Sequence, residues 1–287
     1  MASLKAIRKR IVSVKSTQKV TKAMQMIAAA RLRKAQMAAL GARAYAAHVK
    51  AMALRLAERS GPEGHPFLRV GRGQETEYLV ITSDRGLCGG FNENLLRKFA
   101  DEWKQATGSD AAQTATVIGR KGRDYFRAKG LTAREHLVGF YEGLSMATVL
   151  PVAEGLAARF LDGTSRRAVL IYNRFRSAIA QDIIIEELLP MVVPPLTTAL
   201  KVDYIYEPSR AAVVDRLLTR ALGARIYQAL LESVASELAA RMTAMDNATK
   251  NAADMIQVLT MQFNRARQAA ITKELMDIVN GAESLKK

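Results

Sequence analysis

The segment Ser83–Asn92 holds the residue types most capable of chemistry. It reads Ser-Asp-Arg-Gly-Leu-Cys-Gly-Gly-Phe-Asn and lies between a predicted strand and a predicted helix, where α/β proteins often bind phosphate. One interpretation is therefore an anion cradle. However, no Gly-Lys-Ser/Thr follows and the Gly-x-Gly-x-x-Gly spacing is absent, so the nucleotide-binding patterns are not met. The alternative is a tight turn that needs glycine torsions and is exposed to contact a partner.

Cys88 is the single cysteine, and a nucleophilic role would require a base beside it. The three histidines, His48, His65 and His136, are scattered through the chain, and no motif links any of them to Cys88. The same scatter gives no recognisable zinc set, and no pair of carboxylates has a telling spacing. The sequence therefore predicts no catalytic residue, no cofactor and no metal, and a chain that is not an enzyme by itself.

Positive charge dominates the sequence and is concentrated at its start. The 287 residues carry a formal net charge of +16, and residues 1–59 alone hold 14 Lys/Arg and one acid. Such an excess favours an acidic partner, which is a nucleic acid, an anionic membrane surface or an acidic protein groove. Three interpretations of the basic stripe stay open: a solvated face, a basic coiled coil that binds nucleic acid, and a positive shaft inside an acidic protein sleeve.

Two long segments at the ends of the chain show a heptad repeat. In the first, apolar or small residues recur in steps of three and four from Leu4 to Leu56, with a polar interruption at Gln18–Gln25. In the second, the repeat continues from Leu217 to Ala270. Neither helix can bury its stripe alone, so we expect the two to pair. Because the chain must return, the pair is antiparallel, and its seven-residue period predicts a left-handed supercoil.

The middle of the chain has the texture of a small Rossmann-like α/β domain with a mainly parallel sheet. The expected organisation is a coiled-coil helix at 1–60, an α/β domain at 75–207 and a second coiled-coil helix at 209–284. We predict strands at 78–83, 114–119, 168–173 and 179–186, the last two forming an antiparallel edge hairpin, with a further strand at 202–207. Helices are predicted at 92–107, 120–129 and 145–161.

The compartment is indicated by features that the sequence lacks. A single cysteine permits no internal disulfide, which is typical of a reducing compartment. The first residues contain no apolar core of a signal peptide. No window approaches 18 uncharged apolar residues, so we expect that nothing spans a bilayer and that any membrane association goes through partners.

Three blocks of sequence resemble one family closely. The first is residues 11–24, Ile-Val-Ser-Val-Lys-Ser-Thr-Gln-Lys-Val-Thr-Lys-Ala-Met. The second is Ser83–Asn92, and the third runs from Arg265 to Gly281 and contains Arg-Gln-Ala-Ala-Ile-Thr-Lys-Glu. Together they resemble the gamma subunit of bacterial-type F-type ATP synthase, and the resemblance covers the chain in order from Met1 to its end.

The resemblance implies a rotor. The terminal helices would form a central stalk inside a ring of alpha and beta subunits, and the α/β domain would be a foot that meets the epsilon subunit and the membrane c-ring. Rotation of the c-ring would then be transmitted to the catalytic ring, coupling proton flow to ATP synthesis. The implied location is the cytoplasmic face of the bacterial inner membrane, as a peripheral protein. The nucleotide and the catalytic groups would belong to the alpha and beta chains.

The resemblance also implies which residues contact partners. The expected contacts with the alpha/beta ring are Arg8, Lys9, Lys15, Lys19, Lys22, Met24, Arg267 and Gln268. Tyr206 and Glu207 would approach the c-ring and epsilon at the foot. A further contact loop for beta or epsilon would consist of Asp84, Arg85, Gly86, Leu87, Cys88, Gly89 and Gly90.

Overall fold

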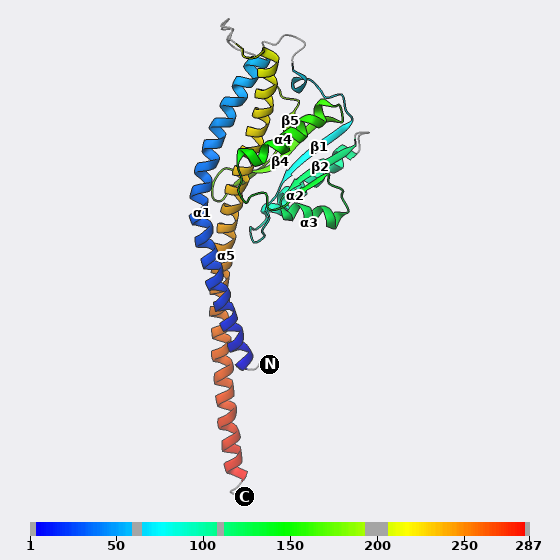
Figure 1. Ribbon diagram of the computed structural model, residues 1–287. Helices are drawn as coiled ribbons and strands as arrows, with labels where there is room; N and C mark the ends of the chain where they lie inside the picture. Colours follow the sequence, from blue (N-terminus) through cyan, green and yellow to red (C-terminus); the bar gives the residue numbers. More distant parts are fainter. Residues whose placement is uncertain (1–3, 59–64, 108–111, 193–205, 285–287) are drawn as a thin grey trace. The chain divides into compact units, whose positions relative to one another are not determined.

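The structure is a computed structural model that describes residues 4–58, 65–107, 112–192 and 206–284 (Figure 1). Two helices are far longer than the others, with 55 and 75 residues. Between them lie a sheet and three shorter helices. The elements in chain order are α1 (Leu4–Glu58), η1 (Pro66–Leu68), β1 (Glu75–Ile81), α2 (Phe91–Thr107), β2 (Gln113–Ile118), α3 (Arg120–Lys129), β3 (Glu135–Leu137), α4 (Met146–Leu161), β4 (Ser165–Phe175), β5 (Gln181–Leu189) and α5 (Arg210–Ser284).

The sheet has the strand order β3-β2-β1-β4-β5. All neighbours are parallel except β4 and β5, which form the antiparallel edge hairpin that the sequence predicts. The strands predicted at 78–83, 114–119, 168–173 and 179–186 are found, although β1 starts three residues earlier and β5 extends three residues later than expected. The strand β3 is not anticipated, because its three residues are mostly exposed and show no buried run.

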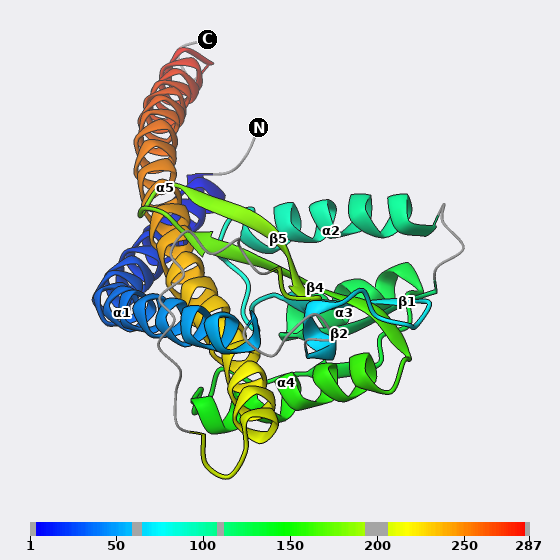
Figure 2. The ribbon, with the colours of Figure 1, turned by 90° about the horizontal axis from the view of Figure 1, so that it is seen from above.

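Helices cover both faces of the sheet (Figure 2). Alternate residues of a strand point to opposite faces, so Leu79 and Ile81 of β1 pack in one core with α4, whereas Tyr78 and Val80 pack in another with α2 and α3. In the second core, Phe99 of α2 stacks on Phe126 of α3 with ring centroids 5.2 Å apart. The α/β expectation is therefore confirmed.

The chain forms two compact units. The terminal unit combines α1 up to Ala28 with α5 from Met242 onward, and the sheet unit comprises Ala29–Arg241. In the terminal unit the helices are joined by Thr21, whose Oγ1 lies 2.8 Å from Thr249 Oγ1, and by Gln25. The amide of Gln25 donates to Asp246 Oδ1 at 2.8 Å. As numbers rise along α1 they fall along α5, so this pair is antiparallel.

In the sheet unit α1 packs on α5 through alanines. The seam positions Ala39, Ala46 and Ala53 are all nearly inaccessible to solvent. Every position of the predicted repeat from Leu4 to Leu56 is buried or half-buried, as is every position from Leu217 to Ala270. The heptad prediction is therefore confirmed at each of these positions. The small side chains of the seam let the two helix backbones approach closely.

The start of α5 follows from a cap. The Ser209 hydroxyl accepts a hydrogen bond from the Ala212 amide at 3.3 Å, which satisfies one of the free donors of the first turn. The strand predicted at 202–207 lies largely outside the described residues, and Tyr206 and Glu207, which are described, are not in a strand. None of the described helices has an apolar stretch long enough to cross a membrane.

Candidate functional site

Side-chain oxygens of the loop Ser83–Asn92 accept hydrogen bonds from nearby backbone amides. The Asp84 Oδ1 accepts a hydrogen bond from the Arg120 amide at the start of α3, at 2.9 Å, and another from the Gly139 amide at 3.3 Å. The Ser83 amide donates to Asn92 Oδ1 at 3.0 Å. A phosphate binds backbone donors at a helix start. At α2, the helix that this loop opens, the Phe91 amide already donates to the Cys88 carbonyl at 3.3 Å, and Asp84 occupies the Arg120 amide at the start of α3. The geometry favours the turn interpretation over a phosphate cradle.

The torsions of this loop differ in one respect from the expectation of glycine torsions. Gly89 has a positive φ of 57°, but Leu87 has one as well, at 63°. Gly86 and Gly90 do not. A leucine in the left-handed region is uncommon and strained. The Leu87 side chain is 64% exposed. This strained backbone position therefore places an apolar side chain in contact with solvent.

Helix α5 anchors the loop inside the sheet unit. Arg241 donates to the Gly86 carbonyl at 3.1 Å and to Glu237 Oε1 at 2.6 Å. Burial raises the pKa of Glu237, and the nearby Asp84 carboxylate adds to that rise while Arg241 opposes it. The Tyr141 hydroxyl donates to the Thr82 carbonyl at 2.5 Å, just before the loop. These contacts hold the loop in one conformation.

Cys88 lies in an environment that suppresses nucleophilic chemistry. The side chain is 2% exposed, and burial raises the pKa of its thiol, which disfavours the reactive thiolate. Its polar neighbour is Asn92, whose amide donates to the sulfur at 3.3 Å. His65 bonds to Asp215 and His48 bonds to the Ala44 carbonyl of its own helix, so neither is paired with Cys88.

His136, the third histidine, is in β3. In the part of the chain that the structure describes, no group of three His, Cys, Asp or Glu residues could hold a metal ion.

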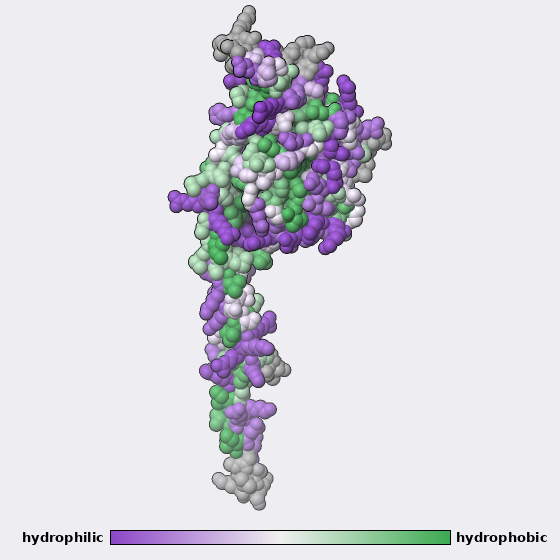
Figure 3. Space-filling model, viewed as in Figure 1, coloured by the Kyte–Doolittle hydropathy of each residue, from purple (hydrophilic) through white to green (hydrophobic). Residues whose placement is uncertain are grey.

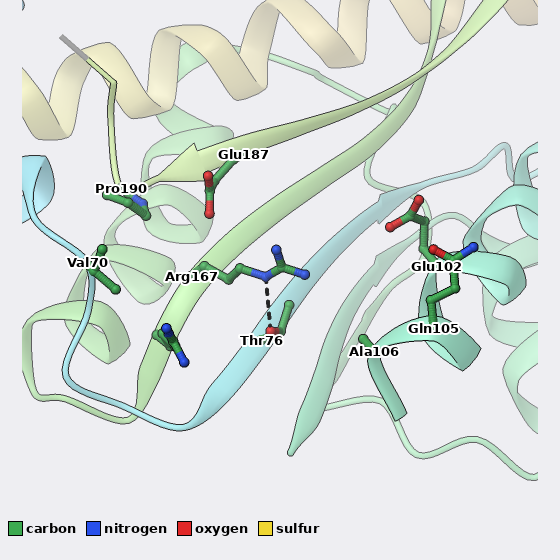
Figure 4. Close-up of a pocket in the computed structure, with 9 residues that line it drawn as sticks. Val70, Thr76, Glu102, Gln105, Ala106, Arg167, Glu187 and Pro190 are labelled. Atoms are coloured by element: carbon green, nitrogen blue, oxygen red, sulfur yellow. Dashed lines mark hydrogen bonds between the residues drawn. The ribbon is translucent and has the colours of Figure 1, made fainter. Parts of the chain in front are cut away.

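A cavity at the start of β1 and β4 carries mixed charge (Figure 4). Arg167 of β4 extends toward β1 and donates to Thr76 Oγ1 at 3.2 Å, whereas Glu187 comes from β5 and Glu102 from α2. A nucleophile paired with a base is not found among these side chains. The lining residues are Val70, Thr76, Glu102, Gln105, Ala106, Arg166, Arg167, Glu187 and Pro190.

The residues predicted to contact the alpha/beta ring lie in the terminal unit, mostly on its surface. Met24 is half-buried beside the seam. Figure 3 shows apolar surface interspersed with hydrophilic surface along these helices. The exposed members of the predicted set are Arg8, Lys9, Lys15, Lys19, Lys22, Arg267 and Gln268.

The sequence reasoning missed the exposed apolar component of this surface. Apolar residues outside the heptad positions were the available signal, because the partner helix cannot cover them. They are large side chains, each more than two-fifths exposed: Val12, Val20, Met26, Ile27, Met255, Val258, Met261, Ile271, Leu275, Met276, Ile278 and Val279. A surface that mixes cations with apolar groups is suited to a protein partner.

The two residues predicted to face the c-ring differ from each other. Tyr206 is half-buried, packs on the core under α4 and carries the Arg210 guanidinium 4.8 Å from its ring centroid. Glu207 is exposed. The structure therefore gives Tyr206 an internal packing role and leaves Glu207 accessible.

This chain is similar to known proteins over almost its whole length. Residues 3–285 match the family described as ATP synthase. The ATP synthase gamma chain of Pelotomaculum thermopropionicum is 45% identical over 286 residues, which cover 99% of this chain and all of the relative. That of an Anaeromyxobacter species is 47% identical over 293 residues and covers both chains completely. These matches give no support to the nucleic-acid-binding alternative.

Solved structures show the same fold. A chain of the Euglena gracilis mitochondrial ATP synthase, in a structure of OSCP, F1 and c-ring, aligns with a TM-score of 0.70 at 18% identity, covering 98% of this chain and 94% of that one. A chain of the Tetrahymena thermophila central stalk and c-ring aligns with a TM-score of 0.62 at 24% identity, covering 80% of this chain and 99% of that one. The fold, the paired terminal helices and the relatives matched over their full length agree, and the chain belongs to the family of ATP synthase gamma chains.

Proposed function

We propose that this gamma chain is the central-stalk rotor of a bacterial F-type ATP synthase. In this role it transmits rotation of the membrane c-ring to the catalytic alpha/beta ring and so couples proton flow to ATP synthesis. One observation carries the proposal. In the terminal unit, two antiparallel helices bury a seam against each other and expose a surface of cations and apolar side chains.

The chain itself is proposed to be non-catalytic. In the loop Ser83–Asn92, Asp84 already accepts a hydrogen bond from the start of α3, and the single thiol is buried beside an amide. In the proposed complex the nucleotide and the reacting groups belong to the alpha and beta chains, and this chain changes their state mechanically.

The partner surfaces follow the division of residues by exposure. The proposed contacts with the alpha/beta ring are Arg8, Lys9, Lys15, Lys19, Lys22, Arg267 and Gln268, and Met24 borders that surface. Glu207, with Tyr206 beneath it, is proposed to face the c-ring and epsilon. In the loop Asp84–Gly90, the exposed Leu87 is proposed to reach beta or epsilon. The complex would hold the chain at the cytoplasmic face of the inner membrane as a peripheral protein.

A rotor must not bind tightly in one orientation. Exposed ion pairs are worth about 0–1 kcal/mol each, whereas breaking a buried pair costs about 3–5 kcal/mol. The cations of α1 in the terminal unit are exposed, and Lys19 is typical of them. Many weak contacts of this kind let the shaft turn while keeping it centred.

The test uses membranes from a bacterial strain that lacks its own gamma chain, supplied with this chain and matching alpha and beta subunits. We expect ATP hydrolysis and ATP-driven proton pumping to be restored. Lys19→Ala alone should retain both, because one weak contact is lost. Replacement of the five cations in the predicted contact set, Arg8, Lys9, Lys15, Lys19 and Lys22, by alanine should abolish coupled pumping.

Two results would count against this proposal. One is the absence of restored pumping with a chain that is folded and bound to the complex. The other is loss of coupled synthesis in the Lys19→Ala variant with assembly intact, which would mean that a single tight contact carries the load.

A further inference from the structure

A polar cluster inside the sheet unit joins four elements. We call it the polar node, and it comprises Arg43 of α1, Tyr172 of β4, Glu186 of β5, and Arg225, Gln228 and Glu232 of α5. These residues line one cavity, together with the charged ends of the β4–β5 hairpin. The cluster is separate from the loop and from the surfaces described above.

The α5 members share one stripe of the helix. Arg225, Gln228 and Glu232 are spaced by three and four residues, which places them on the same face. On the other side of the helix, Ile226 and Leu230 are fully buried in the hydrophobic core. The helix is therefore held by apolar packing on one side and by charged contacts on the other.

Arg225 fixes α5 to the sheet. Its Nε donates to Glu186 Oε1 at 3.1 Å, and its Nη2 donates both to Glu186 Oε2 and to the Tyr172 hydroxyl, the latter at 2.9 Å. The guanidinium also lies 5.1 Å from the centroid of the Tyr172 ring. A bidentate pair of this kind specifies direction as well as distance.

Glu232 fixes α5 to α1. Its side chain is completely buried, and its Oε1 accepts hydrogen bonds from Arg43 Nε at 3.0 Å and from Gln228 Nε2 at 2.9 Å. Arg43 itself is 47% exposed. A fully buried carboxylate needs its partners, since an unpaired charge is strongly destabilising in the interior.

Stability alone does not explain the node. Arg225 Nη1 and Glu232 Oε2 are buried and have no hydrogen-bond partner in the described structure, which costs stability. Well-packed apolar residues often replace buried ion pairs without loss of stability. Apolar burial is non-directional, however, whereas the node adds contacts of fixed direction that resist rotation of α5 about its own axis.

We propose that Arg225 and Glu232 are positioning residues that lock α5 rotationally to the β4–β5 hairpin and to α1, so that torque applied to the sheet unit turns the helix pair without slip. This inference rests on the proposed rotor function. A chain lacking the lock would still fold and assemble, but ATP hydrolysis would drive less proton pumping.

The experiment uses the complete ATP synthase in membrane vesicles and measures proton pumping per ATP hydrolysed. The double variant Arg225→Leu with Glu186→Leu removes the contact between α5 and the hairpin without leaving an orphan charge, and it keeps the Glu232 contact with Arg43. Leu230→Ala is the matched control, because it weakens the apolar side of the same helix segment. The swap of Arg225→Glu with Glu186→Arg restores a pair in the opposite sense, and Tyr172→Phe removes a single hydrogen bond.

We expect the double variant to lower the pumping ratio at least fivefold, Tyr172→Phe to lower it about twofold, and the swap to recover more than half of the loss. Leu230→Ala should reduce thermal stability but keep the wild-type ratio. If the double variant does not assemble, the swap and Tyr172→Phe decide the question. A wild-type ratio in the double variant, an equal drop in Leu230→Ala, or an assembled swap without recovery would overturn the inference.

The rotor proposal can fail independently. If the wild-type chain restores no proton pumping, the rotor function is wrong whatever the variants do. If the wild type pumps and the node variants pump equally well per ATP, only the positioning role is wrong.

Discussion

Helix α5 behaves differently in the two units that it enters. In the sheet unit, every residue from 221 to 239 is buried or half-buried, because α1, α4 and the sheet surround the helix. In the terminal unit, from residue 247 onward, almost only the heptad positions are covered. A helix covered on every side makes its contacts within its own chain, whereas a helix covered along a single stripe leaves a face for other contacts. The sheet unit therefore holds its helix internally, and the terminal unit keeps most of its surface for partners.

The helix seams differ in the same sense. The sheet unit joins α1 to α5 through tightly packed alanines, whereas the terminal unit includes the polar pairs Thr21–Thr249 and Gln25–Asp246. The net contribution of one hydrogen bond to folding stability is about 0.5–1.5 kcal/mol. Burial of one leucine side chain contributes more, about 1.5–3 kcal/mol. We therefore expect the terminal unit to be the weaker of the two in the isolated chain.

The largest expected effect tests whether only the sheet unit is intolerant of added bulk. Gly119 has a φ of 99°, and a Cβ there would lie 2.3 Å from the Thr82 carbonyl oxygen. Gly119→Ala should cost several kcal/mol, about 3–5, because both torsion and space forbid it. Ala23→Leu on the exposed face of α1 should change stability by less than about 0.5 kcal/mol. Urea unfolding of the isolated chain measures both, and similar costs would erase the distinction.

The second prediction compares buried leucines. Leu230 is completely inaccessible in the sheet unit, whereas Leu259 is 6% exposed in the terminal seam. Leucine-to-alanine changes cost about 2–5 kcal/mol, with less where the site can collapse. We expect Leu230→Ala near the upper end and Leu259→Ala at or below the lower end. Hydrogen exchange would locate the loss, and a larger loss from Leu259→Ala would contradict the ranking.

The sequence predicted what depends on local periodicity. The seams of α1 and α5 repeat over many turns, so their buried positions could be found without any tertiary information. The interactions that could not be predicted join distant residues. Asp84 caps a helix that starts 36 residues later, and Arg43 reaches Glu232 across 189 residues. In the sequence, these charges look like ordinary surface groups, and β3 is too short and polar to show a pattern.

The third prediction uses carboxylates whose pKa values shift in opposite directions. In the sheet unit, burial raises the pKa of Glu237 above 4.5, so the native state binds its proton more tightly. Its carboxylate therefore reduces stability as pH rises from about 4.5 through the native pKa. In the terminal unit, a hydrogen bond from Lys250 lowers the pKa of Asp246 below 3.8. Asp246 therefore contributes stability above pH 3.8, and this contribution is lost as pH falls through its native pKa.

Two variants separate these contributions. Glu237→Gln should flatten the pH dependence of unfolding above pH 4.5 and leave the acid limb intact, whereas Asp246→Asn should flatten it only below 3.8. Chemical unfolding of each variant across pH 3 to 8 is the measurement. Both variants acting in the same pH range would show that the two environments are not different in the way the contacts indicate.

The smallest effect concerns thiol reactivity in the folded chain. Cys88 is buried in the sheet unit with a raised thiol pKa, so a thiol reagent should modify it only as the chain unfolds. Val20→Cys in a Cys88→Ala background places a thiol on a side chain position that is 55% exposed in the terminal unit. It should react at once in the isolated chain and become protected upon assembly with alpha and beta. Rapid labelling of Cys88, or no protection of the new cysteine, would break the contrast.

Rotation itself is the most direct test of the account. Alpha and beta subunits would be fixed to a surface with this chain assembled in them, and a visible marker would be attached through Ile179→Cys in a Cys88→Ala background, because Ile179 is 85% exposed in the sheet unit. On adding ATP, the account predicts continuous rotation of the marker in one direction. ATP hydrolysis at the wild-type rate with a stationary or randomly fluctuating marker would contradict it.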